Sequence, residues 1–472
     1  MRRTDRRRFI KQGLVAAGGL GLGLSAWSRW GRQGTPPAIH PALGPLLPVN
    51  DQTTGLPLLM LPQGYRYRSM AWAGDKLKDG YPGPGACDGM GVVAEENGIV
   101  ILIRNHELRG SSGPIGDARK AWDVTGGGTS TLWFDTSSER LVDSRISLNG
   151  TLNNCAGGVT PWGTWLSCEE APLTPELMGL GGDLKQKFWR IGKAQKTHGH
   201  VFEVHPQGEP EPKPILAMGQ FYHEATAIDP QSGIVYMTED STPDAGLYRY
   251  IPRIPGQLQA GGTLQMLRVD GYKRLTATLP RNKPMAFDWV DIKDPEQGHT
   301  PGTHDGAGLV NQGLQAGGTA FVALEGCIHH QGSIYFTSKA GGGAEAGQVF
   351  RLDIAPKTLE LIFEASDRGS FSGPDNIVIS PQGSLIICED RLGMSTQGQY
   401  IAGLDEAGSL FAFCQINPGI RASYAGHKLH KTAVNSEWAG ACFSADGEWM
   451  FVNIYNPGVT LAITGPWQDG PV

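Results

Sequence analysis

Two features of residues 153–170 could do chemistry: a cysteine held in a glycine-rich loop and a pair of adjacent carboxylates. Cys155 follows Asn153-Asn154 and precedes Gly157-Gly158, and Glu169-Glu170 end the short apolar run 164–168. Adjacent carboxylates repel one another, so a protein that keeps two together supplies a cation, an arginine or water. A thiolate in a loop can bind a metal ion. A solvated strand end with a structural cysteine is the competing interpretation.

The run that ends at Glu169 recurs along the chain. In each copy a turn ends in glycine, a mostly apolar run of five residues follows, and a polar residue stands six positions after the glycine. The six polar residues are Arg104, Glu169, Glu239, Ser338, Glu389 and Asn453. Such runs predict strands preceded by turns.

A second set of short apolar runs follows the first, as expected for antiparallel partner strands. These runs are rich in aromatic and branched residues, which favour strands; they are residues 130–134, 200–204, 247–251, 348–352, 409–413 and 459–463. The 67 glycines and 32 prolines provide many tight turns. We therefore predict an all-β six-bladed propeller with loop insertions, forming one domain over residues 51–472. The stretches 172–197 and 253–318 are predicted insertions.

Equivalent positions in the blades of a propeller lie at equal distances from one axis, so the six polar residues are expected to converge on one mouth of the channel. Further acids follow three of them directly: Glu170, Asp240 and Asp390. Other polar residues lie at similar points of the repeat: Asn105, His106, Glu107, Glu224, Glu325, Asp375, Asn376 and Glu437. A ring of carboxylate and amide oxygens is typical of sites for hard cations such as Ca²⁺.

The chain ends and the composition limit the class of protein. Arg6-Arg7 precede Arg8-Phe9-Ile10-Lys11 and a mild apolar segment, so residues 1–30 are predicted to be a twin-arginine export signal and residues 31–50 a linker. The seven cysteines are odd in number and form no close pair, so at least one stays free. A net charge of −6 argues against nucleic-acid binding, and no apolar run beyond the N-terminus is long enough to span a membrane. We expect a periplasmic or extracellular monomer.

Several motifs together resemble the PhoX alkaline phosphatase family. They are Arg104-Asn105-His106-Glu107, Asn154-Cys155-Ala156-Gly157-Gly158, Thr160-Pro161-Trp162-Gly163-Thr164-Trp165, Cys168-Glu169-Glu170, Gly373-Pro374-Asp375-Asn376 and Glu437-Trp438-Ala439-Gly440. The resemblance implies an exported propeller that hydrolyses phosphomonoesters with an iron pair and several calcium ions. The mechanism it implies is metal-assisted phosphoryl transfer.

Carried over to this chain, the resemblance implies roles for individual residues. Cys155 is the implied iron ligand. The implied metal-site set also contains Glu169, Glu170, Glu224, Glu239, Asp240, Glu325, Asp375, Asn376, Glu389 and Glu437. Arg104, Asn105, His106 and Asn154 are expected to bind the substrate, and Cys155, Glu325, Arg104 and Lys339 to take part in catalysis.

One position departs from the family pattern. Ala323 stands two residues before Glu325, where the family carries an arginine that contacts phosphate. Alanine cannot replace the two-pronged donor set of arginine. Arg104, Lys339 and Arg391 are the candidate substitutes by repeat position. A calcium-dependent propeller hydrolase of another class, such as a lactonase or phosphotriesterase, and a non-catalytic, metal-stabilised binding module remain alternatives.

Overall fold

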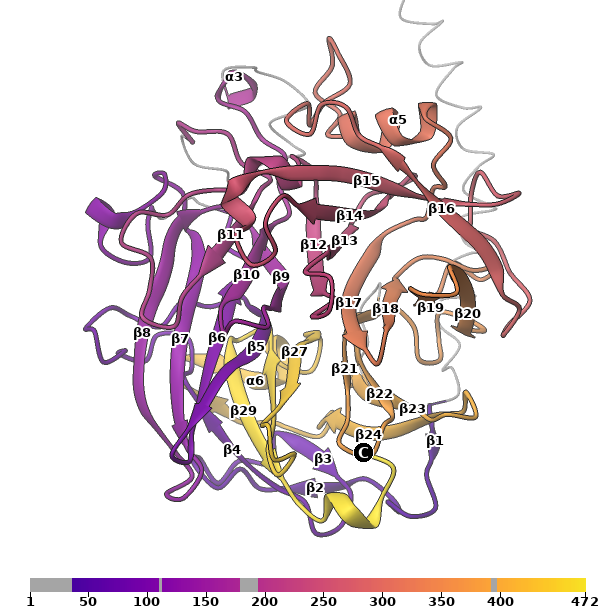
Figure 1. Ribbon diagram of the computed structural model, residues 1–472. Coiled ribbons are helices and arrows are strands. Elements are labelled where there is room, and N and C mark those ends of the chain that lie inside the picture. Colours follow the sequence, from indigo (N-terminus) through magenta and orange to yellow (C-terminus); the bar gives the residue numbers. More distant parts are fainter. Residues whose placement is uncertain (1–35, 110–112, 179–193, 392–396) are drawn as a thin grey trace, which may run out of the picture.

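The structure is a computed structural model that describes residues 36–109, 113–178, 194–391 and 397–472. Nearly all regular structure in this part of the chain is antiparallel β-strand, which confirms the predicted all-β, propeller-like fold (Figure 1). The predicted export signal, residues 1–30, lies outside the described residues. No helix in the described part of the chain is long and apolar enough to cross a bilayer.

Six strands stand around a common axis and form the innermost layer. They are β5 (Cys87–Glu96), β9 (Asn154–Val159), β12 (His223–Ile228), β17 (Leu324–His330), β21 (Pro374–Ile379) and β27 (Trp438–Phe443). Each contacts the next in this order, and β27 contacts β5, so the described inner strands close a ring (Figure 1).

A second strand pairs with each inner strand on the side away from the axis. These strands are β6 (Ile99–His106), β10 (Trp165–Glu169), β13 (Val235–Glu239), β18 (Ser333–Ser338), β22 (Leu385–Glu389) and β28 (Met450–Ile454). They coincide with the six repeated apolar runs of the sequence. The repeat therefore marks the second strand of each unit, and its end marks one mouth of the ring.

The outer strands complete the sheets. They are β7 (Gly127–Asp135), β8 (Arg140–Thr151), β11 (Val201–Val204), β14 (Leu247–Pro252), β15 (Gly262–Val269), β16 (Met285–Asp291), β19 (Gln348–Asp353), β20 (Thr358–Glu364), β23 (Tyr400–Leu404), β24 (Leu410–Ile416) and β29 (Val459–Thr464). The predicted partner runs fall in β7, β11, β14, β19, β24 and β29.

The stretch 253–318 is more ordered than an inserted loop. It contains β15, β16 and the helix α5 (Gly308–Gln315). Strand β16 also pairs with β20, so two neighbouring units share one nine-stranded sheet. Of the other predicted insertion, the structure describes the short helix α3 (Pro175–Met178) and the residues around it.

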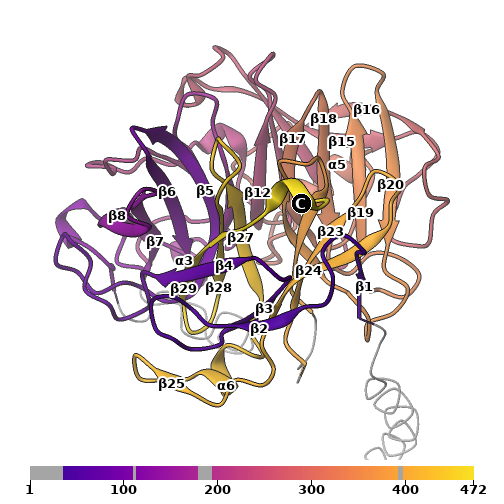
Figure 2. The ribbon, with the colours of Figure 1, turned by 90° about the horizontal axis from the view of Figure 1, so that it is seen from below.

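The N-terminal strands close the ring from outside. Strand β4 (Arg66–Met70) pairs with β29, the last strand of the chain. Strand β3 (Leu59–Leu61) pairs with β24, β2 (Leu47–Val49) with β3, and β1 (Ala38–Ile39) with β24 (Figure 2). Part of the predicted linker, residues 31–50, is therefore strand.

The remaining elements are small. They are β25 (Ser423–Tyr424), β26 (His427–Lys428), the helix α6 (Leu429–Thr432) and the 3₁₀ turns η2 (Ala118–Lys120), η3 (Leu216–Met218), η4 (Leu258–Ala260) and η5 (Trp467–Asp469).

Apolar side chains between neighbouring sheets form the core. Phe336 and Phe350 are fully buried and stack with ring centroids 5.2 Å apart. Burying one such side chain contributes about 2 kcal/mol. The stacked sheets hold the inner strands in fixed places, and the functional side chains project from those strands.

Candidate metal centre

Each inner strand contains a β-bulge near its start. The pairing with the second strand shifts register after Cys87, Asn154, His223, Leu324, Pro374 and Ala439. A bulge adds an unpaired residue and redirects its side chain. We call the first residues of the six bulges the bulge row. In chain order they are Asp88, Cys155, Glu224, Glu325, Asp375 and Gly440.

Five members of the bulge row carry side chains that can bind metal ions. Small residues follow most of them, because the inner strands approach one another closely at this level. A Cβ atom added to Gly326 would lie 2.5 Å from the carbonyl oxygen of Asp375, and one added to Gly89 would lie 2.5 Å from Cα of Ala156. The close approach brings side chains from neighbouring units within reach of a shared ion.

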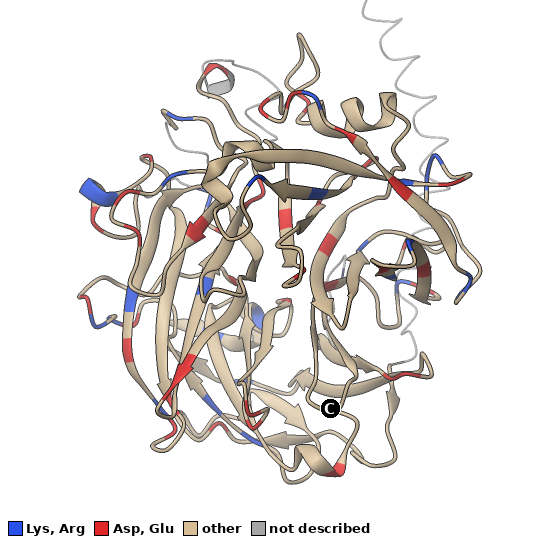
Figure 3. Cartoon of the chain, in the orientation of Figure 1, with Lys and Arg blue, Asp and Glu red and all other residues tan. Residues whose placement is uncertain are grey.

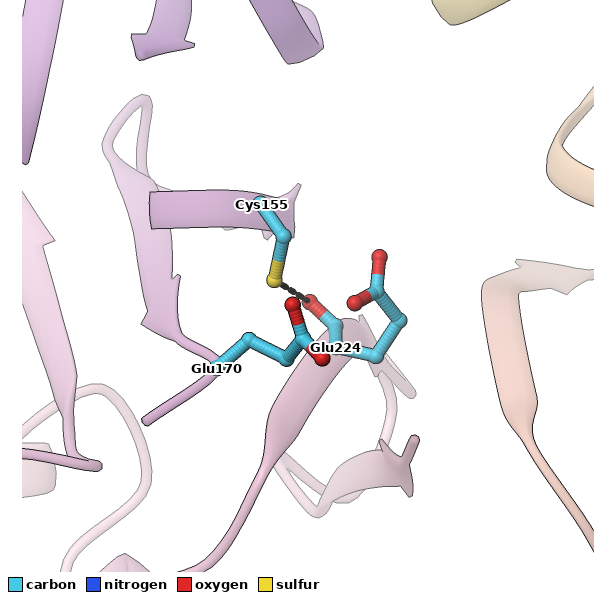
Figure 4. A group of neighbouring side chains, drawn as sticks. All are labelled: Cys155, Glu170 and Glu224. Atoms are coloured by element: carbon cyan, nitrogen blue, oxygen red, sulfur yellow. Dashed lines mark hydrogen bonds between the residues drawn. The ribbon is translucent and has the colours of Figure 1, made fainter. Parts of the chain in front are cut away.

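The bulge row contributes to three groups of ligand atoms, each lying within 4.8 Å of one another. The first group is Cys155, Glu170 and Glu224 (Figure 4). The second group is Glu224, Glu325 and Asp375, and the third is Asp375, Asp390 and Glu437. Because Glu224 and Asp375 are each shared, the three groups form one continuous arc.

The charged residues that directly follow five of the second strands face the same space, whereas the equivalent residue of the sixth, Ile454, is packed in the apolar core. In each unit, the residue just before the bulge pairs with a residue near the end of the second strand. We call the residues that come directly after these partners the exit row: Glu107, Glu170, Asp240, Lys339, Asp390 and Ile454. In the first five, the backbone N–H bonds to a carbonyl just before the inner strand, as from Lys339 to Ala323 at 2.8 Å. Four members of the row are acids and one is a lysine. Figure 3 shows acidic residues near the centre of the ring.

We call the set formed by the metal-binding and charged members of the two rows, together with Glu437 directly before β27, the acidic ring. It consists of Asp88, Glu107, Cys155, Glu170, Glu224, Asp240, Glu325, Lys339, Asp375, Asp390 and Glu437. Burial, followed by Glu107 and Asp375, raises the pKa of Asp88. Burial, followed by Asp240 and Glu107, raises the pKa of Glu170.

Unneutralised negative charge dominates the acidic ring. Burial, followed by Glu325 and Asp375, raises the pKa of Glu224 well above its ordinary value. Burial is also the main reason that the pKa of Asp375 rises to about 7. Carboxylates in this position stay ionised only if cations join them.

The donor set fits metal ions of two kinds. Carboxylate oxygens from several strands suit Ca²⁺, and a thiolate at one end suits a transition metal such as iron. Burial, followed by Glu224 and Glu170, raises the pKa of the Cys155 thiol, so the thiolate needs a cation beside it. The thiol lies 3.1 Å from the carbonyl oxygen of His223 and 3.8 Å from that of Glu224 (Figure 4).

The structure places Glu169, Glu239 and Glu389 outside the three groups. Each pairs with the residue just before a bulge. His106, Ser338 and Asn453 hold the same position in the other units, and we call these six the strand-end row. Glu239 accepts hydrogen bonds from Gly246 N and Tyr248 Oη, both at 2.8 Å. Glu389 accepts from Ser372 N, Tyr400 N and the Arg391 guanidinium. These contacts occupy the carboxylates of the strand-end row. The expected convergence on the channel is therefore found one residue later.

Glu169 belongs to a buried network of its own. Its Oε1 lies 2.7 Å from Nδ1 of His198 and accepts from Leu152 N at 2.8 Å, and its Oε2 accepts from Gly199 N at 2.9 Å. Nε2 of His198 lies 3.1 Å from Asp123 Oδ2. The network fixes the backbone near Cys155 and Glu170 through the neighbouring residues Leu152 and Gly199.

The residues expected to bind substrate are buried among neighbouring strands. Arg104 is fully buried, and its Nη1 donates to Ala71 O at 3.1 Å and to Thr460 Oγ1 at 2.8 Å. The ring nitrogens of His106 each lie 2.9 Å from Gly85 O and Ser130 Oγ. His106 pairs with Cys87 just before the bulge of β5, as Glu169 pairs with Asn154 just before the bulge of β9. His106, and not Arg104, is therefore the structural equivalent of Glu169.

Three amides support the ring from outside it. Asn105 Nδ2 donates to the carbonyls of Cys155 and Ala156 at 3.0 and 2.6 Å. Asn154 Nδ2 donates to Ser167 Oγ at 2.9 Å. Asn376 donates to Asp375 Oδ1 at 2.7 Å and accepts from Gly440 N at 2.6 Å, joining two units.

Sequence reasoning missed Asp88 and Arg109. Each of the bulge residues Asp88, Cys155, Glu224 and Glu325 is followed by Gly or Ala, a pattern that could have identified Asp88. Arg109 lies at the rim, with Nη2 3.2 Å from Glu107 Oε1 and Nε 3.0 Å from Asn153 Oδ1. Asn153 in turn donates to Glu170 Oε2 at 2.9 Å.

A cavity of about 510 Å³ follows the axis beside the bulges. The second residue of every bulge lines it: Gly89, Ala156, Ala225, Gly326, Asn376 and Ala441. Its wall is mainly small and apolar, so the charge is concentrated at the acidic ring.

Comparison with known proteins gives a family and a fold. The family model described as alkaline phosphatase PhoX matches residues 43–125 and 117–458. A solved structure, Pseudomonas fluorescens PhoX in complex with vanadate, a transition state analogue, superposes with a TM-score of 0.61 at 18% identity, covering 91% of this chain and 99% of that chain.

A second solved structure gives a lower score. A gluconolactonase, XC5397 from Xanthomonas campestris, gives a TM-score of 0.41 at 10% identity, covering 90% of this chain and 98% of that chain. No curated protein sequence matches the chain.

Proposed function

The chain belongs to the alkaline phosphatase PhoX family, and we propose that it releases inorganic phosphate from small phosphate monoesters at the acidic ring. The observation that supports this location is the arc of three ligand groups with the Cys155 thiol at one end. Phosphoryl transfer depends on positioning and on neutralising charge around the phosphate. The acidic ring is the part of the described chain with enough buried donors to hold the cations that do so.

The arc favours different ions at its two ends. We propose iron at Cys155, Glu170 and Glu224, where the thiolate lies, and calcium at Asp375, Asp390 and Glu437, where the donors are oxygens. When bound, these ions would polarise the phosphate oxygens and offset the charge that develops on them. The carboxylates hold the ions, and the bulged strands fix the carboxylates.

Arg109 is the guanidinium best placed to contact the substrate phosphate. Its side chain is 58% exposed at the rim, and its contacts with Glu107 and Asn153 hold it over the acidic ring. Arginine binds phosphate through two parallel N–H donors. Of the predicted substitutes for the arginine missing at Ala323, Arg104 is buried between units and Arg391 bonds to Glu389.

The predicted compartment follows from the sequence. PhoX proteins are exported phosphatases, and the twin-arginine pattern at Arg6-Arg7 supports export of this chain to the periplasm or beyond. Cell fractionation of wild-type and Arg6→Lys/Arg7→Lys chains tests this, since the variant should remain in the cytoplasm.

Metal analysis combined with p-nitrophenyl phosphate hydrolysis tests the proposed function. We expect iron, calcium and turnover in the purified full chain. Cys155→Ser should lose iron and at least about 100-fold in activity, because loss of a direct ligand exceeds the effect of losing its supporting contacts. Calcium without iron, together with lactone hydrolysis, would favour a lactonase instead. A chain with neither metal nor turnover would leave a binding module.

The same assay tests Arg109. Arg109→Ala should raise KM about tenfold and weaken inhibition by inorganic phosphate, since a charge-assisted hydrogen bond is worth about 1.5 kcal/mol. Arg119→Ala is the matched control, because Arg119 is 90% exposed and pairs with Asp117. Equal KM values in both variants would contradict the role of Arg109.

A further inference from the structure

Lys339 is the one cation of the exit row. It directly follows β18, at the place where the equivalent residues of four other units are Glu107, Glu170, Asp240 and Asp390. Its side chain is 16% exposed, so the ammonium lies inside the acidic ring and not above it. A buried ammonium without partners is costly, so its surroundings decide its role.

Three carboxylates surround the ammonium. Nζ of Lys339 lies 3.3 Å from Glu325 Oε1 and 3.7 Å from Asp375 Oδ2, and it forms an ion pair with Asp390. The three acids come from β17, from β21 and from the end of β22. The contacts with Glu325 and Asp375 are ion pairs held by charge attraction, which reaches beyond hydrogen-bond distance.

The partners of Lys339 belong to two different ligand groups. Glu325 and Asp375 are members of the middle group, and Asp375 and Asp390 are members of the third. The ammonium therefore lies at the junction of these groups, in contact with the carboxylate they share. Cys155 and Glu170, at the other end of the arc, have no ion pair with it among the described contacts.

We propose that the Lys339 ammonium takes the place of a divalent cation at this junction. The acidic ring then binds ions at its two ends, while Lys339 holds Glu325, Asp375 and Asp390 together before any ion is loaded. The first part of this inference rests on the proposed metal-dependent function. The second part concerns the metal-free chain and is independent of it.

The charge balance supports this role. Burial opposes the charged form of Lys339, but Glu325, Asp390 and Asp375 raise its pKa well above the ordinary value, so it stays protonated. Burial would raise the pKa of Asp390, yet Lys339 lowers it. Lys339 thus favours the charged form of Asp390, and Asp390 favours that of Lys339.

The test compares four full-length chains: wild type, Lys339→Ala, Lys339→Arg and the control Lys213→Ala. Lys213 is 70% exposed, and its partner Glu211 lies 3.8 Å away at the surface. Each chain is stripped of ions with a chelator and melted, and is then loaded with calcium and iron and measured for bound metal. Arginine keeps the charge, while alanine removes it and leaves room for an ion.

We expect metal-free Lys339→Ala to melt about 4 °C below the wild type, since removing one partner of a buried ion pair is strongly destabilising. After loading, it should hold one more calcium per chain than the wild type. Lys339→Arg and Lys213→Ala should match the wild type in both measurements. A Lys339→Ala chain that folds only with calcium present also supports the proposal.

Unchanged melting and unchanged metal content in Lys339→Ala would overturn the proposal. A wild type that binds no metal would instead contradict the proposed function. In that case the metal-free melting difference still decides whether Lys339 holds the three carboxylates together.

Discussion

The strand-end row and the exit row are chain neighbours with opposite surroundings. Glu169, Glu239 and Glu389 accept hydrogen bonds from nearby backbone N–H groups and side chains. Glu170, Asp240 and Asp390 follow them directly, and their side chains face the acidic ring. Because side chains alternate along a strand, one step along the chain moves a carboxylate from one environment to the other.

The difference shows that residue type does not decide the role of a carboxylate here. Glu169 and Glu170 are chemically identical and adjacent. Glu169 accepts hydrogen bonds from several fixed donors. Glu170 accepts one from Asn153 and lies close to other acidic side chains. A carboxylate with fixed donors is a candidate structural group, and one crowded by like charges is a candidate metal ligand.

The largest expected effect comes from removing the charge of Glu170. Glu170→Gln should lose at least about 100-fold in phosphatase activity, because a metal ligand is lost, while its metal-free melting temperature stays equal or rises. Steady-state kinetics and thermal melting of the stripped chain measure the two parts. A fully active variant would remove Glu170 from the ligand set.

Glu169→Gln should give the reverse pattern. It leaves His198 and three backbone N–H groups without their charged acceptor, so the free energy of unfolding should fall by about 3–5 kcal/mol. Activity per folded molecule and bound metal should stay close to wild type. Denaturant unfolding measures the loss, and a specific loss of iron would instead place Glu169 among the ligands.

The same network predicts a pH dependence of stability. Burial opposes the charged form of His198, but Glu169 and Asp123 raise its pKa to about 9. The pKa of an unfolded histidine is about 6.5, so the stabilisation is fully present below that pH and is lost as pH rises through 9. The free energy of unfolding should fall by an amount on the order of 3 kcal/mol. His198→Asn should remove this slope, and a retained slope would assign it to another group.

The smallest effect tests Glu239. Tyr248→Phe removes the hydroxyl that donates to Glu239 Oε2 at 2.8 Å and leaves the Gly246 N–H in place. The free energy of unfolding should fall by about 1 kcal/mol, the net value of one hydrogen bond, with unchanged kinetics. Altered metal content in this variant would contradict the separation of Glu239 from the acidic ring.

Much of the fold could be predicted because the second strands carry a clear signal. The glycine-headed runs repeat along the chain, and every one of them is a second strand in the structure. The ligand-type residues Cys155, Glu224, Glu325, Asp375 and Glu437 could be predicted by their motifs, and the structure brings them together. Their binding of ions stays a prediction.

The other site residues could not be predicted, because their positions depend on the register of strand pairing. The pattern of apolar residues does not determine that register. Strand β6 has eight residues where β10 and β13 have five, so counting six positions from Gly98 selects Arg104, whereas pairing selects His106. The bulges that direct the side chains of Asp88 and Cys155 arise from the pairing of two strands. The sequence of one strand alone does not show them. Arg109 lies beyond the repeat, and only its contacts with Glu107 and Asn153 identify it.

The pairing of β4 with β29 has a consequence for when the site comes into being. The inner strands β5 and β27 meet where the ring closes; Asp88 lies on β5, and Glu437 directly precedes β27. Asn453 Nδ2 donates to Asp88 O at 2.6 Å across that seam. A chain still emerging from the ribosome lacks the last strand and therefore has an open seam. On the proposed function, all the ligands come together only in the finished chain, so ions would load after translation, once the two chain ends have closed the ring.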